Sequence, residues 1–284
     1  MLNTLKLISF ILTTLLVGCS QPAPVDDWCS PEGWARVRTA TYEKARQGDA
    51  EAQFKIGYIY SNECAEKIDL NEALKWLRLA AQNGHLDAQT TIGFFYAEGK
   101  GVAKNDIEAK KWYLKAAEAG NARAQANLGY FLADGRGGQR DVERALYWWN
   151  KAAISGDSIA SYALCKASMG GKIVRQDYKK AYAYCMVSAR QGDELAQYHL
   201  GSMHSRGLGR EKNLQEAVRW WLLAANNEEP RAQYMLGLAY EKGFGVKIDK
   251  QKSQKWFELA AKQGFSRQYI QNLLEAEKAK NADK

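Results

Sequence analysis

A glycine recurs at a constant spacing through most of the sequence. Successive copies stand 36 residues apart, no insertion or deletion interrupts the series, and glutamate replaces glycine once. The series is Gly48, Gly84, Gly120, Gly156, Gly192, Glu228 and Gly264. A fixed period of this length is typical of a solenoid, in which each repeat packs only on its neighbours. It argues against a globular domain with one central core.

Each repeat reads as two short helices. In the repeat from 84 to 119, Ala88, Ile92 and Tyr96 share one side of a first helix that ends at Gly99 and Gly101. The second helix begins after an Asp or Asn that can act as its N-cap. These residues are Asp69, Asn105, Asp141, Asp177, Asn213 and Asp249. A glutamate three positions later, at 72, 108 and 216, predicts a capping box.

Small and aromatic residues also repeat. The first helix has an internal glycine at Gly57, Gly93, Gly129, Gly201 and Gly237, with Cys165 in the fourth repeat. Glycine inside a helix costs about 0.5–1 kcal/mol relative to alanine, so its recurrence predicts close approach by the partner helix. The second helix carries Trp76, Trp112, Trp148, Trp220 and Trp256, with Tyr184 in the fourth repeat. Periodic aromatic residues at helical spacing predict core packing between helices and repeats.

The repeat resembles the Sel1-like repeat, a relative of the tetratricopeptide repeat. The resemblance rests on the successive patterns A-x-x-x-L/I-G-x-x-Y, G-x-G-V, D/N, A-x-x-W and A-A-x-x-G. The resemblance covers residues 48–263, or six repeats. It implies an all-α fold, a right-handed α/α solenoid of six helical hairpins. It also implies protein–protein interaction, without naming one activity.

The ends of the repeat array differ from its middle. Residues 31–47 read as one helix that begins at Pro31 and resembles half a repeat, so we expect an N-terminal capping helix. Residues 264–284 predict a C-terminal capping helix with an apolar side at Tyr269, Ile270, Leu273 and Leu274, followed by a charged tail.

The first 30 residues predict export. Lys6 precedes an apolar run at 7–15 that is too short to span a bilayer comfortably, so residues 1–18 read as a signal peptide. Residues 16–19 (LVGC) resemble the bacterial lipobox, which implies that Cys19 carries lipid and that 19–30 is a lipid-anchored linker. Ser20 and Gln21 then point to the outer membrane, and we expect the protein to face the periplasm. An ordinary secretory signal is the alternative.

Four further cysteines make disulfides the expectation for an exported protein. Cys165 stands at the glycine position of a first helix, and Cys185 lies on the facing side of the second, so these two should pair. Cys29 and Cys64 would then join the capping helix to the first repeat. Buried free thiols are the alternative.

No catalytic or metal-binding pattern is present. The three histidines, His85, His199 and His204, form no HExxH motif and no cluster with cysteine at metal-ligand spacing. No Ser-x-x-Lys occurs, so the penicillin binding linked to some cysteine-rich relatives lacks its usual nucleophile. We expect no enzymatic activity, no cofactor and no metal. The net charge of +8 suits a moderate preference for acidic surfaces, and no nucleic-acid motif occurs.

The first helices should line the concave side of the array. Two positions around the internal glycine are expected to point there, and the sequence places aromatic residues at seven of the twelve sites. We predict partner binding by Phe54, Tyr58, Phe94, Tyr130, Tyr162, Tyr198 and Tyr234, because rigid aromatic residues are favoured at binding hot spots. A register error that makes these residues core is the alternative.

Charge along this side is expected to change sign. Glu51, Asp87, Glu98 and Asp134 mark the early repeats, whereas Arg206, Arg231 and Lys242 mark the later ones. We therefore predict a partner whose negative charge lies over the later repeats, with Arg206 and Lys242 among the binding residues.

The sequence thus favours a non-enzymatic, lipid-anchored periplasmic module that binds a protein partner. Lipid-anchored Sel1-like proteins resemble the immunity partners of secreted antibacterial toxins, including phospholipase effectors, so an immunity protein is the second hypothesis. A cell-wall hydrolase or β-lactamase is a third hypothesis, for which the sequence offers no catalytic residue. Outward display as a host-interaction factor is a fourth.

Overall fold

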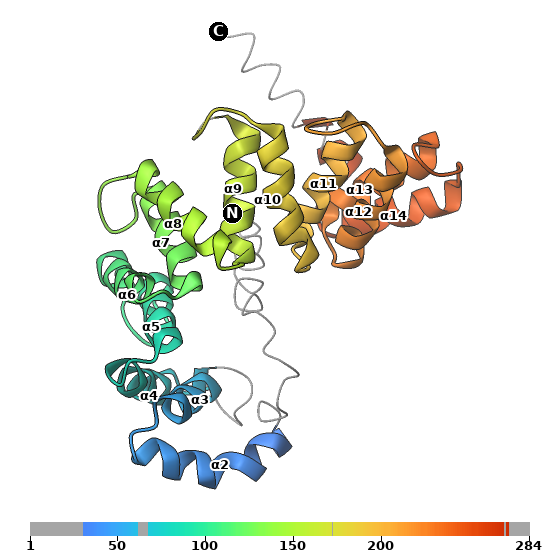
Figure 1. The fold of residues 1–284 in the computed structure, drawn as a ribbon. Helices are drawn as coiled ribbons and strands as arrows, with labels where there is room; N and C mark the ends of the chain where they lie inside the picture. Colours follow the sequence, from blue (N-terminus) through green and yellow to red (C-terminus); the bar gives the residue numbers. More distant parts are fainter. Residues whose placement is uncertain (1–30, 62–67, 172, 270, 273–284) are drawn as a thin grey trace. The chain divides into compact units, whose positions relative to one another are not determined.

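The computed structural model describes residues 31–61, 68–171, 173–269 and 271–272. The described part is helical, and α2 (Pro31–Arg46) precedes a series of helix pairs (Figure 1). The pairs are α3 (Ala50–Ser61) with α4 (Leu70–Gln82), α5 (Leu86–Glu98) with α6 (Asp106–Glu118), α7 (Ala122–Asp134) with α8 (Val142–Ile154), α9 (Ser158–Gly170) with α10 (Tyr178–Arg190), α11 (Glu194–Arg206) with α12 (Leu214–Asn226), and α13 (Pro230–Lys242) with α14 (Lys250–Lys262). The chain forms two compact units, Met1–Ala152 and Ala153–Lys284.

The predicted N-caps of the second helices are confirmed. Asp69 accepts hydrogen bonds from the amides of Asn71 and Glu72, and the same position caps every later second helix. The capping box is not the geometry observed. The amide of Asp69 donates to the carbonyl of Tyr60 at the end of the preceding helix (2.9 Å), and the side chain of Glu72 pairs with Lys75. The N-cap amide therefore already has a partner, and the glutamate forms a pair along its own helix instead.

The internal glycine of each first helix lies against the second helix, as predicted. A Cβ atom added at Gly93 would lie 2.8 Å from the ring of Tyr113 and 3.3 Å from the carbonyl oxygen of Ala109. Trp149 and Trp221 occupy the place of Tyr113 in later repeats and are 3 % and 2 % exposed. Each glycine thus makes room for a large side chain. This close packing explains why glycine recurs at this helix position although it destabilises a helix relative to alanine.

In the fourth repeat this glycine and its facing side chain are both cysteines. The structure joins Cys165 on α9 and Cys185 on α10 in a disulfide, which is the pairing expected from the sequence. Both residues are fully buried. The covalent bond therefore takes the place that a glycine and a large side chain fill in other repeats.

The periodic tryptophans are half-buried rather than fully enclosed. Trp112 packs against a core cluster that includes Leu77 of α4 and Ile92 of α5, and Trp220 packs against the cluster around Leu200. Each of these rings thus covers a core built by helices that precede it. The predicted packing role holds, with one side of each ring left accessible.

A row of buried glutamines links five of the six first helices to the helix before each, and Ser161 takes this position in α9. The Nε2 group of Gln53 donates to the carbonyl of Ala45 (2.9 Å), and the same bond recurs at Gln89, Gln125, Gln197 and Gln233. The Oε1 atom of Gln53 accepts from Asn83 in the following loop (2.9 Å). The Oε1 atoms of Gln89 and Gln125 are buried without a partner, and the positions equivalent to Asn83 there are Ala119 and Ser155. No sequence pattern noted above predicts this role for the glutamines.

The capping helix packs on the first repeat. Ala45 of α2 is buried with Ala52 and Ile56 of α3, and the hydroxyl groups of Tyr42 and Tyr60 lie 2.8 Å apart. Residues 1–30, Cys64 and the tail beyond 272 lie outside the described residues, so the signal peptide, Cys19, the Cys29–Cys64 pair and most of the C-terminal cap remain predictions. Among the helices that are described, none is long and apolar enough to cross a membrane.

Candidate functional site

The twelve residues predicted to line the concave side lie on the first helices, and together we name them the first-helix face. They are Phe54, Tyr58, Thr90, Phe94, Ala126, Tyr130, Tyr162, Lys166, Tyr198, Ser202, Tyr234 and Leu238. Most are half-buried, Lys166 is exposed, and Thr90, Ala126 and Tyr162 are buried. The face therefore combines packing between repeats with accessible ring surface.

In three of the repeats, the first position on this face contacts the residue 31 positions later, at the start of the next repeat. The ring of Phe54 stacks on His85 with centroids 4.4 Å apart, and the hydroxyl of Thr90 donates to Oδ1 of Asn121 (3.1 Å). Tyr234 contacts Phe265 at 5.7 Å in the same way. These side chains thus stabilise the junction between adjacent repeats, which explains why they are not fully exposed.

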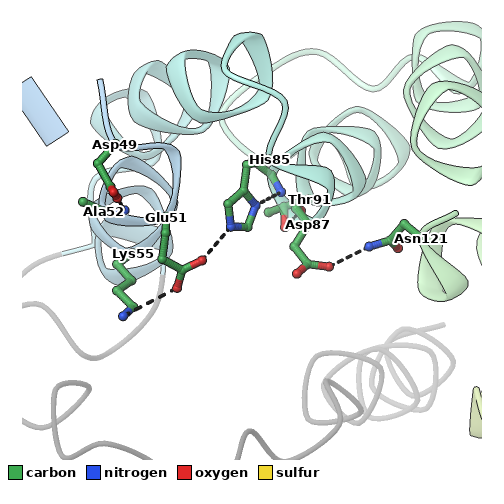
Figure 2. Close-up of polar contacts among 9 residues, drawn as sticks. Asp49, Glu51, Ala52, Lys55, His85, Asp87, Thr91 and Asn121 are labelled. Atoms are coloured by element: carbon green, nitrogen blue, oxygen red, sulfur yellow. Dashed lines mark hydrogen bonds and ion pairs between the residues drawn. The ribbon is translucent and has the colours of Figure 1, made fainter. Parts of the chain in front are cut away.

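In the first unit, two of the four predicted acidic residues, Glu51 and Asp87, belong to a row of contacts between repeats (Figure 2). His85 caps α5 through Nδ1, which accepts from the amide of Ala88 (3.2 Å), so its Nε2 carries the proton that is donated to Oε2 of Glu51 (2.9 Å). Glu51 also pairs with Lys55 (3.5 Å). Asp87 accepts from Nδ2 of Asn121 (2.8 Å). Glu51 and Asp87 are therefore partly engaged within the protein.

In the second unit, His199 lies between two rings of the first-helix face. Its centroid is 5.9 Å from that of Tyr162 and 5.3 Å from that of Tyr198. Burial lowers the pKa of His199 to about 4, and the positive charges of Arg231 and Lys166 act in the same direction. His199 is therefore neutral at physiological pH and contributes a polar ring without a charge.

Positive charge lies over the rings of this part of the face. The guanidinium of Arg231 lies 4.9 Å from the ring centroid of Tyr198, and Nζ of Lys166 lies 5.7 Å from that of Tyr162. Arg231 also pairs with the buried carboxylate of Glu229 (2.5 Å). Arg231 is thus partly neutralised, whereas Lys166 projects from an exposed position.

The structure corrects the prediction for one binding residue, Tyr162, and places two others, Arg206 and Lys242, at exposed helix ends. Tyr162 was expected on the partner-binding surface, but it is only 9 % exposed and belongs to a core cluster with Cys165 and Leu200. It is enclosed because α11 of the next repeat places His199 against its ring. Arg206 and Lys242 are exposed at the ends of α11 and α13, as a role in charge recognition requires.

The two remaining histidines, His85 and His204, have structural roles or buried positions. His85 caps α5, and His204 is 2 % exposed with its Nε2 atom 3.5 Å from the hydroxyl of Tyr182. In the described part of the chain, no group of three or more His, Cys, Asp or Glu side chains is placed to hold a metal ion.

Comparison with known proteins identifies the repeats. The family model for the Sel1 repeat matches residues 50–85, 86–121, 122–157, 158–193, 195–228 and 230–265. No curated protein matches the sequence. The matched segments follow the observed helix pairs from one first helix to the next.

Several solved structures are similar to this one. A Sel1 repeat protein from Oxalobacter formigenes is 32 % identical, with a TM-score of 0.73 over 82 % of this chain and 99 % of that one. A protective antigen of uropathogenic Escherichia coli strains, described as displaying an SLR fold, is 34 % identical with a TM-score of 0.71. The match covers 80 % of this chain but 48 % of the antigen, so the chain spans about half the length of that relative.

More distant matches include the immunity protein Pa5087 from Pseudomonas aeruginosa, at 18 % identity and a TM-score of 0.51 over 75 % of this chain and 81 % of that one. That likeness shows the fold alone. The helix pairs, the six matched repeats and the two closely similar structures agree on an all-α solenoid of the kind that serves protein interaction. The chain belongs to the Sel1 repeat family.

Proposed function

We propose that this protein is a non-enzymatic, lipid-anchored periplasmic module that binds a protein partner through its first-helix face. The observation that supports this most is the accessible aromatic surface of the second unit. Tyr198 and Tyr234 are half-buried on adjacent first helices, with Arg231 over one ring and exposed Lys166 nearby. Rigid rings beside basic groups favour a partner with acidic and apolar side chains.

The location is part of the same proposal. Residues 16–19 resemble a lipobox, so Cys19 would carry the lipid that holds the protein at the outer membrane, facing the periplasm. Cys19→Ser should abolish metabolic labelling of the protein by radioactive palmitate and release it from the membrane fraction. Labelling that survives the substitution would contradict lipidation at Cys19.

An immunity function is the second candidate. Immunity proteins Pa5087 and PA5088 from Pseudomonas aeruginosa share the fold at TM-scores of 0.51 and 0.52. At sequence identities of 18 % and 17 %, the likeness shows a shared fold and gives no information about the binding partner. The identity of the bound protein decides between the candidates, because an immunity protein would bind a secreted toxin and block its activity.

The test is affinity capture with matched baits. The bait is the oxidised chain from Ser20, which retains every element that the structure describes, incubated with envelope extract of its own strain. One variant carries Tyr198→Ala and Tyr234→Ala on the first-helix face. A control carries Ile107→Ala and Tyr147→Ala, which remove exposed apolar side chains from α6 and α8. Tyr162 is left intact because it is a core residue.

We expect a specific protein that the wild-type and control baits retain and the face variant loses. Titration calorimetry with the purified partner should then show affinity at least about tenfold weaker for the face variant, the loss of one hot-spot contact. Equal retention by all three baits would place the interface elsewhere. Capture of nothing from the extract would contradict a protein partner in the envelope.

A further inference from the structure

The second helices of the last three repeats expose a side that the first-helix face does not include. Positions separated by three, four, seven and ten residues share one side of a helix. We name this side of α10, α12 and α14 the second-helix face. Its residues are Lys180, Ala183, Tyr184, Val187 and Arg190; Glu216, Arg219, Trp220, Leu223 and Asn226; and Lys252, Lys255, Trp256, Leu259 and Lys262.

This face carries apolar side chains in contact with solvent. Val187 is 40 % exposed and Leu223 is 49 % exposed, and Leu259 is half-buried at the equivalent position of the sixth repeat. Beside them, Tyr184, Trp220 and Trp256 are half-buried. One aromatic and one aliphatic side chain therefore recur together in each of three successive repeats.

The charges on the second-helix face are almost all positive. Six lysine and arginine residues stand against one acidic residue, Glu216, which pairs with Arg219 (2.7 Å). The six basic residues are all exposed. The same five positions of α4, α6 and α8 hold five basic and three acidic residues. The excess of positive charge is thus concentrated in the second unit.

The aromatic rings of α6 and α8 also differ from those of the last three repeats, whereas α4 has Leu79 beside Trp76 as they do. In α6 and α8, Lys115 and Lys151 lie over the rings of Trp112 and Trp148, with Nζ 5.5 and 5.3 Å from the centroids. Val187, Leu223 and Leu259 replace those lysines in the last three repeats. The rings there are flanked by aliphatic groups, and the positive charges stand around the apolar row.

We propose that the second-helix face of repeats 4–6 lies on the surface of an anionic phospholipid bilayer. Lysine and arginine would bind the phosphate headgroups, while Trp220, Trp256 and Leu223 would enter the interface, where aromatic and aliphatic side chains are favoured. The long basic side chains can keep their charges at the headgroups while their stems cover apolar surface. This contact requires neither lipid at Cys19 nor a partner on the first-helix face.

Composition favours a bilayer over a protein as the occupant. Lysine is depleted in the core of protein–protein interfaces, yet four of the six basic residues here are lysines, three of them on α14. A combination of Lys and Arg with Trp and Leu on one exposed side is instead typical of segments that lie on anionic membranes.

Vesicle co-sedimentation tests the proposal with the folded chain from Ser20. We compare vesicles of phosphatidylcholine with vesicles that contain about 30 % phosphatidylglycerol, because surface charge drives this type of binding. One variant carries Arg219→Gln and Lys255→Gln. The control carries Lys75→Gln and Lys111→Gln, which remove the same charges from the same repeat position in the first unit. The side chains of Arg219, Lys75 and Lys111 are 75 %, 64 % and 66 % exposed and pair with the preceding Glu at similar distances.

We expect binding to the anionic vesicles only, reduced by added salt. Arg219→Gln with Lys255→Gln should lower the partition coefficient roughly 25-fold, about fivefold for each charge, whereas the control should change it less than about threefold. Equal losses in the two variants would show a non-specific effect of net charge and overturn the proposal. Absence of binding to anionic vesicles would also overturn it and leave an acidic protein as the occupant.

Fluorescence quenching by brominated phosphatidylglycerol gives an independent measurement. Trp220→Phe with Trp256→Phe should remove most of the quenching, and Trp76→Phe with Trp112→Phe should preserve it, because only the first pair lies on the proposed contact. Quenching that depends equally on both pairs would contradict the placement. Circular dichroism verifies that every variant remains folded.

Discussion

At the scale of single residues, Glu228 has a backbone conformation that other repeats reserve for glycine. Its φ is +62°, and the six glycines at the equivalent positions have φ between +82° and +99°. A Cβ atom added at those glycines would meet nothing within 4 Å, so torsion alone disfavours other residues there. The left-handed conformation costs a non-glycine residue roughly 1–2 kcal/mol.

Glu228→Gly should therefore increase the free energy of unfolding by about 1 kcal/mol, after the entropic cost of glycine in the unfolded chain. Urea unfolding of the wild type and the variant measures the change. Glu228→Ala serves as the control, because it removes the charge and keeps the Cβ atom. An equal gain in the control would assign the effect to charge rather than to torsion.

Asp193 and His199 predict opposite pH dependences within one repeat. Burial raises the pKa of Asp193 to about 6 and lowers that of His199 to about 4. The folded chain binds a proton at Asp193 more readily than the unfolded chain, so lower pH favours folding through this residue. The unfolded chain binds a proton at His199 more readily, so lower pH favours unfolding through that one.

The two effects oppose each other between about pH 4 and 6, and single substitutions separate them. Relative to the wild type, His199→Gln should gain up to about 3 kcal/mol of stability as pH falls from about 6.5 to 4. Asp193→Asn should lose stability relative to the wild type as pH falls from about 6 to 4. The measurement is the urea midpoint of each protein across this pH range. If the midpoints of both variants changed with pH as that of the wild type does, the two assigned pH dependences would be contradicted.

At the scale of helices, the fourth repeat replaces a packing contact by a covalent bond. Gly129 faces Trp149 in the third repeat and Gly201 faces Trp221 in the fifth, while Cys165 and Cys185 are joined between them. A disulfide with a sequence separation of 20 residues stabilises by about 3 kcal/mol in the chain-entropy model.

Cys165→Gly with Cys185→Trp should restore the packing of the neighbouring repeats and make stability independent of reductant. The wild type should lose about 3 kcal/mol in dithiothreitol, and Cys165→Ala with Cys185→Ala should be similarly weakened in either condition. Urea unfolding with and without dithiothreitol measures all three proteins. If the Gly/Trp variant were no more stable than the Ala/Ala variant, the packing would not substitute for the bond.

The row of buried glutamines offers a second test between helices. Gln89 has a buried Oε1 atom without a partner, and Ala119 stands where Asn83 supplies the donor to Gln53. The backbone at Ala119 (φ −75°, ψ 0°) is close to that at Asn83 (φ −83°, ψ 15°). Ala119→Asn should therefore add about 1 kcal/mol by satisfying this acceptor. The gain should vanish in a Gln89→Leu background, and a gain that persists there would have another cause.

At the scale of the whole molecule, charge at one repeat position changes sign along the chain. Glu98 and Asp134 end α5 and α7, whereas Arg206 and Lys242 end α11 and α13. Exchanging the two pairs of signs keeps the net charge constant. We expect weaker binding to the captured partner and an altered salt dependence, measured by calorimetry at two ionic strengths. Unchanged affinity and salt response would exclude charge-directed recognition along the array.

Local features were predictable and contacts between repeats were not. The N-caps at Asp69 and its equivalents require only neighbouring amides, so the sequence shows them directly. The prediction of a capping box is wrong because the amide of Asp69 donates its hydrogen bond to the carbonyl of Tyr60 instead. The pattern of its own helix predicts an accessible Tyr162, but the ring of His199 from the next repeat encloses it. No motif in the sequence assigns His85 a role, although it caps α5 and contacts Glu51 of the preceding repeat.

The period, the helix pairs, the membership of the repeat family and the Cys165–Cys185 pairing were all predictable, because they follow from spacing along one chain. Tertiary structure decided which rings stay accessible, which glutamines lack a partner and which basic residues surround an apolar row. Those properties depend on side chains about one repeat away. Burial and satisfied hydrogen bonds are set by the neighbour that stacks on each helix rather than by the helix alone.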